Sequence, residues 1–428
     1  MFTRIKEYVK TVSESSPFLR HVLTLVSGTA IGQVIVFLMM MIITRMYGSQ
    51  AVGELALFNS FVGIIVAVGA GRYDMALMLE HDDRNAKVML LLALRLLAFS
   101  AAVATLVLVL ARPLLAQHFT PALSRMIPLV GVAAFLLGGM AAIQFWFNRK
   151  TEYKTIALNR LNQQVGSTGS QVAVGAVGFR GLPGMVTGLI AGYAIAFTSI
   201  MVRAKDFRRL DTKGADSMRT LARKHWKMPV LNGPNALVDA LRLNGINLLI
   251  GMADASALGQ YDIANRVVNV PVILINSAVS QVFFQKLSLV KPGDMYREVK
   301  NAVVRSIKIG VLPFAALYVV APWLLPFVFG SQWADSGYYA QALIPGVAML
   351  LITSPISTMF VVTGTQHWLL GFAVFYAAAP LAWLWFSPFE LLPTVYGLGA
   401  VLFVCLVIMT TMSLIAAKRY DRKGTDAQ

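Results

Sequence analysis

Charge is scarce in this sequence: only 13% of the 428 residues are Asp, Glu, Lys or Arg, whereas 57% are hydrophobic. A soluble domain averages about 25% charged residues, so the burial of a core does not explain the deficit. A helix needs about 20 mostly apolar residues to cross the roughly 30 Å hydrocarbon core of a bilayer, and many stretches reach that length. The composition therefore predicts an integral membrane protein.

Several chemical groups are also nearly absent. Cys405 is the single cysteine, which excludes an internal disulfide, and the five histidines are scattered without metal-ligand spacing. The net charge is +17, but the basic residues lie at the ends of apolar runs, where a membrane surface explains them better than nucleic acid does. We expect no cofactor, metal or nucleic-acid partner. The first 20 residues lack the apolar segment of a cleaved signal peptide, so none is expected.

The apolar runs predict an all-α fold with twelve transmembrane helices. Their expected bounds are 20–46, 52–79, 88–111, 125–148, 157–180, 182–202, 229–253, 260–286, 301–323, 337–363, 366–387 and 394–417. Lys and Arg are enriched in cytoplasmic loops, and a cytoplasmic N-terminus places 27 of them in inner segments and four in outer ones. Both termini are therefore expected in the cytoplasm.

The longest polar stretch, residues 203–227, divides six spans from six and carries nine basic residues. We interpret it as a cytoplasmic linker that either contains a surface helix or is a plain basic connector, and the plain connector is favoured. The predicted domains are an N-terminal six-helix bundle (1–202), a cytoplasmic linker (203–228) and a C-terminal six-helix bundle (229–428). The halves resemble each other at an offset of 206 residues, which matches Gly53 with Gly259 and Asn59 with Asn265. Six spans is an even number, so the halves are predicted to be parallel repeats, as in transporters that alternate access around a site between their halves.

Polar residues recur at helical spacing inside three of these spans. They are Arg160, Gln164, Ser167 and Gln171 in the fifth; Asn232, Asn235, Asp239 and Arg242 in the seventh; and Asp262, Arg266, Asn269, Asn276 and Ser280 in the eighth. Charged groups are costly in a bilayer, so such stripes face either another helix or a watery cavity. Both interpretations stay open for the fifth span, and a cavity is favoured for the eighth.

Individual charges in the spans have alternative interpretations as well. Asp239 and Arg242 lie one turn apart and form either a structural pair or, at Asp239, a site for a coupling ion; Asp262 and Asp74 are further coupling candidates. Arg72, late in the second span, either extends to the membrane surface or lines the cavity. The candidate cavity contains more arginine than acid, which favours an anionic ligand such as a phosphate.

The chain resembles the oligosaccharide flippases of the multidrug/oligosaccharidyl-lipid/polysaccharide exporter superfamily. Three segments carry the resemblance: TRMYGSQAVGELALFNSF (44–61), GRYDMALMLEHDD (71–83) and GQYDIANRVVNVPVILINSAVSQVFFQKLS (259–288). The third is also similar to lipid II flippases, in which the arginine of an A-x-R-x-x-x-x-P pattern faces the cavity. Ala264, Arg266 and Pro271 match that pattern, so the resemblance implies a substrate-binding role for Arg266.

The resemblance implies transport, and no enzymatic activity. The expected substrate is an undecaprenyl-pyrophosphate-linked oligosaccharide, moved from the cytoplasmic to the periplasmic leaflet of the bacterial inner membrane for O-antigen, capsule or exopolysaccharide synthesis. Expected partners are membrane lipids, a polysaccharide polymerase and a chain-length regulator. Candidate substrate-binding residues are Arg266, Arg72, Arg160, Gln164, Gln171, Asn269 and Asn235.

Two other functions remain. A multidrug/cation antiporter of the same superfamily would share the architecture, but an acidic cavity would be expected for it. A polysaccharide polymerase or ligase typically carries a large periplasmic loop, and the longest outer connection here has about 13 residues. No DxD-type metal site is present, and we interpret the run His81-Asp82-Asp83 as a solvated cytoplasmic turn.

Overall fold

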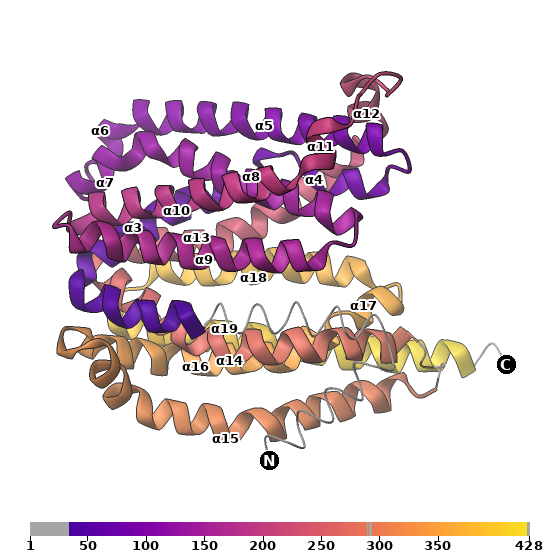
Figure 1. Ribbon diagram of the computed structural model, residues 1–428. Coiled ribbons are helices and arrows are strands. Elements are labelled where there is room, and N and C mark those ends of the chain that lie inside the picture. The colour runs from indigo at the N-terminus through magenta and orange to yellow at the C-terminus, as the bar shows by residue number, and fades with distance from the viewer. Residues whose placement is uncertain (1–33, 289, 291–292, 426–428) are drawn as a thin grey trace, which may run out of the picture. The chain divides into compact units, whose positions relative to one another are not determined.

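The computed structural model describes the backbone of residues 34–288, 290 and 293–425. Within these ranges it also describes the side chains, except those of residues 273–288 and 423–425. Within these ranges the chain is helical and contains no strand (Figure 1). The described residues divide into two compact units: residues 34–47 and 57–237 form unit 1, and residues 48–56 and those from 238 onward form unit 2. Two helices, α3 (Ser49–Gly69) and α13 (Gly233–Ala253), each contribute to both units.

Unit 1 is built around four long helices. After α3 it contains α4 (Tyr73–Ala76), η1 (Leu77–Leu79), α5 (Asp83–Leu110), α6 (Arg112–Leu115), α7 (Pro121–Met126), η2 (Ile127–Leu129), α8 (Val130–Arg149), α9 (Tyr153–Ala176), α10 (Gly181–Arg203), α11 (Lys205–Arg209), α12 (Met218–Lys224) and η3 (Met228–Asn232). The long helices run side by side and pack in the order α5, α8, α10 and α9, so that α8 packs on both α5 and α10. The short α11 and α12 belong to the polar stretch between the predicted halves.

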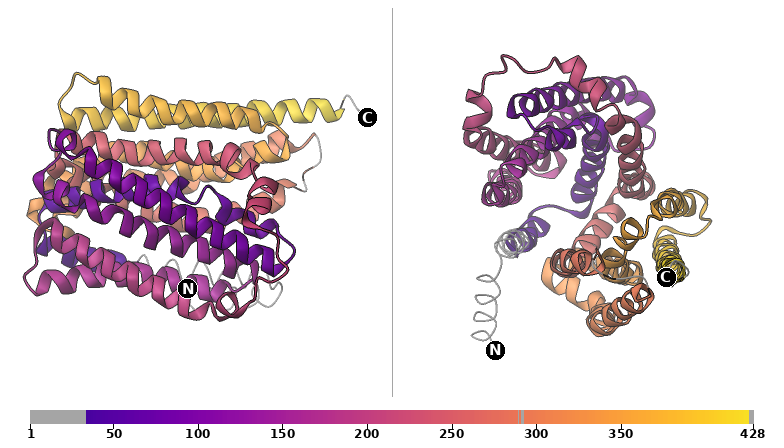
Figure 2. Two further views of the ribbon diagram at one scale, coloured as in Figure 1. Left: turned by 90° about the horizontal axis from the view of Figure 1, so that it is seen from above. Right: turned by 90° about the vertical axis from the view of Figure 1, so that its right-hand side faces the viewer.

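Unit 2 surrounds one buried helix. Its elements after α13 are α14 (Ala255–Ser288), α15 (Met295–Phe329), η4 (Ser331–Trp333), α16 (Ala334–Ile356), α17 (Met359–Val362), α18 (Gln366–Phe386) and α19 (Leu391–Thr425). Helix α16 packs against α14, α15 and α19, and most of its residues are buried. Figure 2 shows α19 running alongside α18, which it also contacts.

The helices coincide with the predicted spans, with differences at particular points. Nine helical segments of the described residues are long and apolar enough to cross a membrane, and Val34–Met46 is a shorter apolar helix. The predicted span 20–46 is described only from residue 34. Helices α9 and α14, which carry two of the polar stripes, are not among the nine. The total of twelve spans and the side of the termini stay predictions.

The second predicted span, 52–79, is not one continuous helix. Helix α3 ends at Gly69, and Gly71 and Arg72 then adopt left-handed backbone angles, with φ of 58° and 57°. The hydroxyl of Ser100 on α5 donates to the Gly69 carbonyl at 2.7 Å, which satisfies a group that the break leaves without a helical partner. A left-handed arginine is strained, because its Cβ crowds the backbone.

Candidate functional site

The charged pair of α14 lies within a single helix. Arg266 Nε donates to Asp262 Oδ2 at 2.7 Å, one turn earlier. The Arg266 side chain is 43% exposed, whereas that of Asp262 is 13% exposed. One turn beyond Arg266, the amide of Asn269 bonds to the carbonyl and side-chain oxygens of Asn265. Polar groups of α14 thus satisfy one another, and the guanidinium is held in place while part of it stays accessible. The side chains of Asn276 and Ser280 lie outside the described part of this helix.

A second charged pair lies on α13. Arg242 donates to Asp239 Oδ1 at 2.7 Å, which confirms the predicted pairing. The Arg242 guanidinium also lies over the ring of Tyr376 on α18, 4.5 Å from its centroid. Arg242 is therefore fixed between two helices by an ion pair and a cation–π contact. Asp239 keeps 63% of its side chain exposed, and Asn235, one turn earlier, is exposed as well.

The helix break of unit 1 holds two buried polar atoms without a partner. Among the described residues, Arg72 Nε and Asp74 Oδ1 are inaccessible to solvent and make no hydrogen bond. Arg72 instead directs Nη2 at the sulfur of Met75, 2.7 Å away, and Asp74 is 8% exposed. The Nε of Arg72 is thus enclosed, although the residue as a whole is partly exposed. A buried unpartnered carboxylate oxygen is costly and marks a place where a proton, water or ion is accommodated.

The polar stripe of α9 is divided by the packing of α10. Arg160 is exposed and Gln164 is partly buried, but Ser167 and Gln171 are buried. Gln171 donates from Nε2 to the Met185 carbonyl at 3.2 Å, across the contact with α10. The first part of the stripe remains accessible, whereas its second part belongs to a helix–helix interface.

Glycines of α10 explain why α9 comes so close. A Cβ built at Gly188 would lie 2.6 Å from the Cα of Gln171, and one at Gly192 would lie 2.3 Å from that of Ser167. With Gly184, these residues form a G-x-x-x-G-x-x-x-G series, the small-residue pattern that lets membrane helices approach closely. The structure thus places Gln171, a predicted substrate-binding residue, where a ligand does not reach its side chain.

The segments that matched at the 206-residue offset cross each other within unit 2. A Cβ at Gly53 would lie 1.7 Å from the Ala255 carbonyl oxygen, and one at Gly259 would lie 2.0 Å from that of Ser49. Both pairs are related by the same offset, so the crossing is symmetric about the two glycines. The hydroxyls of Ser49 and Ser256 are 2.5 Å apart beside it. Neither glycine can carry a side chain without separating the helices.

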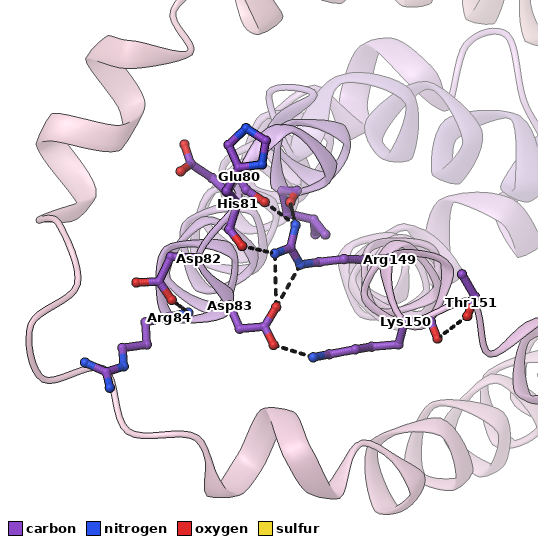
Figure 3. A network of polar contacts seen from close by, with 9 residues as sticks. Glu80, His81, Asp82, Asp83, Arg84, Arg149, Lys150 and Thr151 are labelled. Atoms are coloured by element: carbon purple, nitrogen blue, oxygen red, sulfur yellow. Dashed lines mark hydrogen bonds and ion pairs between the residues drawn. The ribbon is translucent and has the colours of Figure 1, made fainter.

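A polar network ties the start of α5 to the end of α8 (Figure 3). Arg149 donates to Asp83 Oδ1 at 3.0 Å and to the His81 carbonyl at 2.8 Å, and it also bonds to the Glu80 carbonyl. Lys150 forms an ion pair with the other carboxylate oxygen of Asp83. The interpretation of this turn as merely solvated is wrong for Asp83, because Arg149 at the end of α8 and the following Lys150 both form ion pairs with it. Among the described residues, no group of three His, Cys, Asp or Glu side chains could bind a metal.

The stretch between the predicted halves, which we call the collar (residues 203–227), is docked on unit 1. Its Phe207 and Leu221 are buried, and Phe207 packs against Trp146 of α8 with ring centroids 5.5 Å apart. Asn85 exchanges two hydrogen bonds with Asp216, at 3.0 and 2.9 Å. The prediction of a plain connector is therefore wrong, since these contacts give the collar a defined position.

Glu80 joins the collar to the helix break and was not recognised from the sequence. Its side chain is 2% exposed; Lys224 lies 2.8 Å from Oε1 and His225 Nε2 lies 2.5 Å from the same atom. Burial disfavours the charged form, but the hydrogen bonds and charges of Lys224 and His225 outweigh it and hold the pKa of Glu80 below its ordinary value. Tyr73 adds a bond to the Ala222 carbonyl at 3.2 Å. No periodicity marks Glu80, because its partners lie about 145 residues away.

Comparison with known proteins assigns the family. A family model described as polysaccharide biosynthesis protein matches residues 42–337. The chain belongs to this polysaccharide biosynthesis protein family. The match covers the helix break, the α9 stripe, the collar and the charged pairs of α13 and α14. No curated protein sequence matches the chain.

Solved structures show which fold this family member adopts. The lipid II flippase MurJ in an inward closed conformation is similar over 94% of this chain and 90% of its own, with a TM-score of 0.71 and 11% identity. An inward-facing multidrug resistance MATE family transporter of the MOP superfamily covers 91% of this chain and 99% of its own, with a TM-score of 0.66 and 15% identity. An outward-facing MATE family transporter covers 95% of this chain and 99% of its own, with a TM-score of 0.56 and 10% identity.

The chain is thus a multi-pass membrane protein whose fold is similar to those of a lipid II flippase and of MATE family transporters. The predicted family is confirmed, and a fold shared with flippases and exporters agrees with the prediction that the chain is not an enzyme. The structure brings Asp262 together with Arg266 and Asp239 with Arg242 in unit 2. Asn269 also lies in unit 2, on α14, whereas unit 1 holds the candidates at the helix break and along α9, together with Asn235 at the start of α13.

Proposed function

We propose that this protein is a flippase that moves an undecaprenyl-pyrophosphate-linked oligosaccharide from the cytoplasmic to the periplasmic leaflet of the bacterial inner membrane by alternating access. The observation that carries the proposal is membership of the polysaccharide biosynthesis family over residues 42–337. The fold, which the lipid II flippase shares, supports it. A lipid-linked glycan is the form in which sugars reach a membrane protein of such a pathway.

Arg266 is the residue that we expect to bind the pyrophosphate. It is accessible and held at a defined position by Asp262, and a guanidinium matches phosphate oxygens in bidentate fashion. Arg72 and Arg160 are the supporting cations. Gln164, Asn269 and Asn235 offer amides for the sugar hydroxyls, whereas the burial of Gln171 removes it from this group.

A proton or cation gradient would drive the return step. Of the three carboxylates considered, Asp239 and Asp262 each have an arginine partner. Asp74 is buried and leaves Oδ1 without a hydrogen bond in the described part of the chain. Asp74 is therefore the carrier that we favour, because binding a proton would remove the cost of its buried charge.

The test compares Arg266→Ala with Arg95→Ala in cells that lack the chromosomal copy. Arg95 lies on α5, is exposed and, among the described residues, bonds only to the sulfur of Met218 at 3.1 Å, so it is a matched control for losing an arginine from a span. We expect surface polysaccharide to fall at least tenfold in Arg266→Ala and to stay normal in Arg95→Ala. Normal output from Arg266→Ala at normal protein levels would refute the assignment.

The alternative is a multidrug/cation antiporter, which the MATE-like fold favours. Drug-resistance assays on the same cells separate the two functions. Resistance that depends on Asp74 but not on Arg266, with unchanged surface polysaccharide, would support the antiporter.

A further inference from the structure

Helix α15 is longer than a membrane requires. Its 35 residues extend about 52 Å at 1.5 Å per residue, against a hydrocarbon core of about 30 Å. Residues 309–329 contain no charged side chain and by themselves span about 31 Å. The preceding residues, 295–308, therefore lie at the membrane boundary and beyond it.

This first part of α15, residues 295–308, has a buried apolar face and an exposed face that carries basic side chains. One face, with Met295, Val299 and Ala302, is buried in a cluster with α16, α17 and α19. The opposite face carries Arg297, Asn301, Arg305 and Lys308 at spacings of four, four and three, and all four are exposed. The stripe thus leads along the helix to the point where the uncharged segment begins.

The two cations nearest the uncharged segment have no partner of their own. Arg297 pairs with Asp294 at 3.0 Å, but Arg305 and Lys308 make no hydrogen bond or ion pair within the part of the chain that the structure describes. An exposed cation in water needs no partner. At the edge of a hydrocarbon layer, however, it requires an anion or the headgroup region to retain its charge.

The neighbours of these two cations are aliphatic. Val304 and Ile307 are both about two-fifths exposed, and Leu312, one turn beyond Lys308, is 77% exposed. A face that only meets water would not combine exposed aliphatic side chains with free cations. It fits a ligand that has an anionic head and an apolar tail side by side.

We propose that Arg305 and Lys308 bind the phosphate of an anionic phospholipid, whose acyl chains lie along the exposed aliphatic side chains of α15. The depth estimated from the uncharged segment places both cations at the headgroup level, where phospholipid is the abundant amphiphile. The site is separate from the residues proposed for transport, so its failure and the failure of the flippase proposal are distinguishable.

The collar supplies a matched control. Arg219 and Arg223 are two exposed cations one turn apart on α12, but their neighbours Thr220 and Lys224 are polar. They carry the same charge without the aliphatic surface.

The experiment is native mass spectrometry of the delipidated full-length protein, titrated with phosphatidylglycerol and with phosphatidylcholine. Each juxtamembrane cation contributes about fivefold to anionic-lipid binding, so R305Q/K308Q should bind phosphatidylglycerol about 20- to 30-fold more weakly. R219Q/R223Q should change binding less than twofold, and R305K/K308R should retain it.

Three results would overturn the proposal. The first is equal binding of both lipids by the wild type, a result that does not depend on the folding of any variant. The second is an equal loss of phosphatidylglycerol binding in R219Q/R223Q and R305Q/K308Q. The third comes from a parallel titration with undecaprenyl diphosphate, in which R305Q/K308Q loses that lipid and binds phosphatidylglycerol as the wild type does.

Discussion

The polar stripes of α9 and α14 look alike in the sequence but differ in the structure. On α9, the buried part of the stripe bonds to α10, and the glycines of α10 bring the two backbones into contact. On α14, Asp262 and Arg266 pair along their own helix and the arginine stays partly exposed. A polar stripe in a membrane helix can therefore stabilise a helix pair or present groups to a ligand, and the partner's location distinguishes the two.

The α9–α10 contact should be the most sensitive to substitution. In Gly192→Ala, the new methyl group would meet the backbone at Ser167, and we expect a loss of about 3 kcal/mol because overpacking at backbone atoms cannot be relieved by a rotamer change. Gly169→Ala on α9 is the control, since no atom lies within 4 Å of its Cβ position. Thermal unfolding in detergent measures both; equal midpoints for the two variants would contradict the close approach.

The collar should depend on Glu80 in a pH-sensitive way. Glu80→Gln removes the charge that Lys224 and His225 contact, and we expect a loss of about 1.5 kcal/mol at pH 7. Because the pKa of Glu80 is lowered in the folded protein, its contribution is present above the unfolded value of about 4.3 and is lost as the pH falls through the folded value.

The measurement is the difference in unfolding midpoint between wild type and Glu80→Gln from pH 5, which lies below the ordinary pKa of histidine, to pH 3.5. The difference should narrow as the pH falls below the unfolded pKa of Glu80. A difference that grows over this range would show that the ion pairs do not set the stability of this contact.

Gln171 should have the smallest effect. Gln171→Leu removes one bond to the Met185 carbonyl, and hydrogen bonds between membrane helices are worth about 0.6 kcal/mol on average. Thermal unfolding should show this small loss, and surface polysaccharide should remain normal. If Gln171→Leu lost transport while keeping the stability of the wild type, Gln171 would have to be counted as a substrate-binding residue.

The sequence predicted the helices well because hydropathy is a local property. It also predicted the Asp239–Arg242 pair, since residues three apart share a helix face. The break at Gly71 and Arg72 was missed because an arginine rarely adopts left-handed angles, and no proline announces the interruption. The collar and Glu80 were missed because their contacts join residues far apart in the chain.

The α9 interface could have been found from the sequence. The glycines at 184, 188 and 192 recur every four residues on the following helix and signal a close neighbour. Polarity and helical spacing are alike for Gln171 and Arg266, but only Gln171 faces a helix with such glycines. Small residues on adjacent spans thus help to decide which polar stripes are structural.

The central claim is that Arg266 acts in transport and not in stability. The most direct measurement is the transfer of a fluorescent undecaprenyl-pyrophosphate-linked oligosaccharide across proteoliposomes, with the unfolding midpoint recorded for the same samples. We predict that Arg266→Ala transfers at least tenfold more slowly while its midpoint stays within about 2 °C of the wild type, a shift that corresponds to less than about 2 kcal/mol in a protein of this size. Transfer at the wild-type rate, or a loss of transfer that follows a lowered midpoint, would contradict the account.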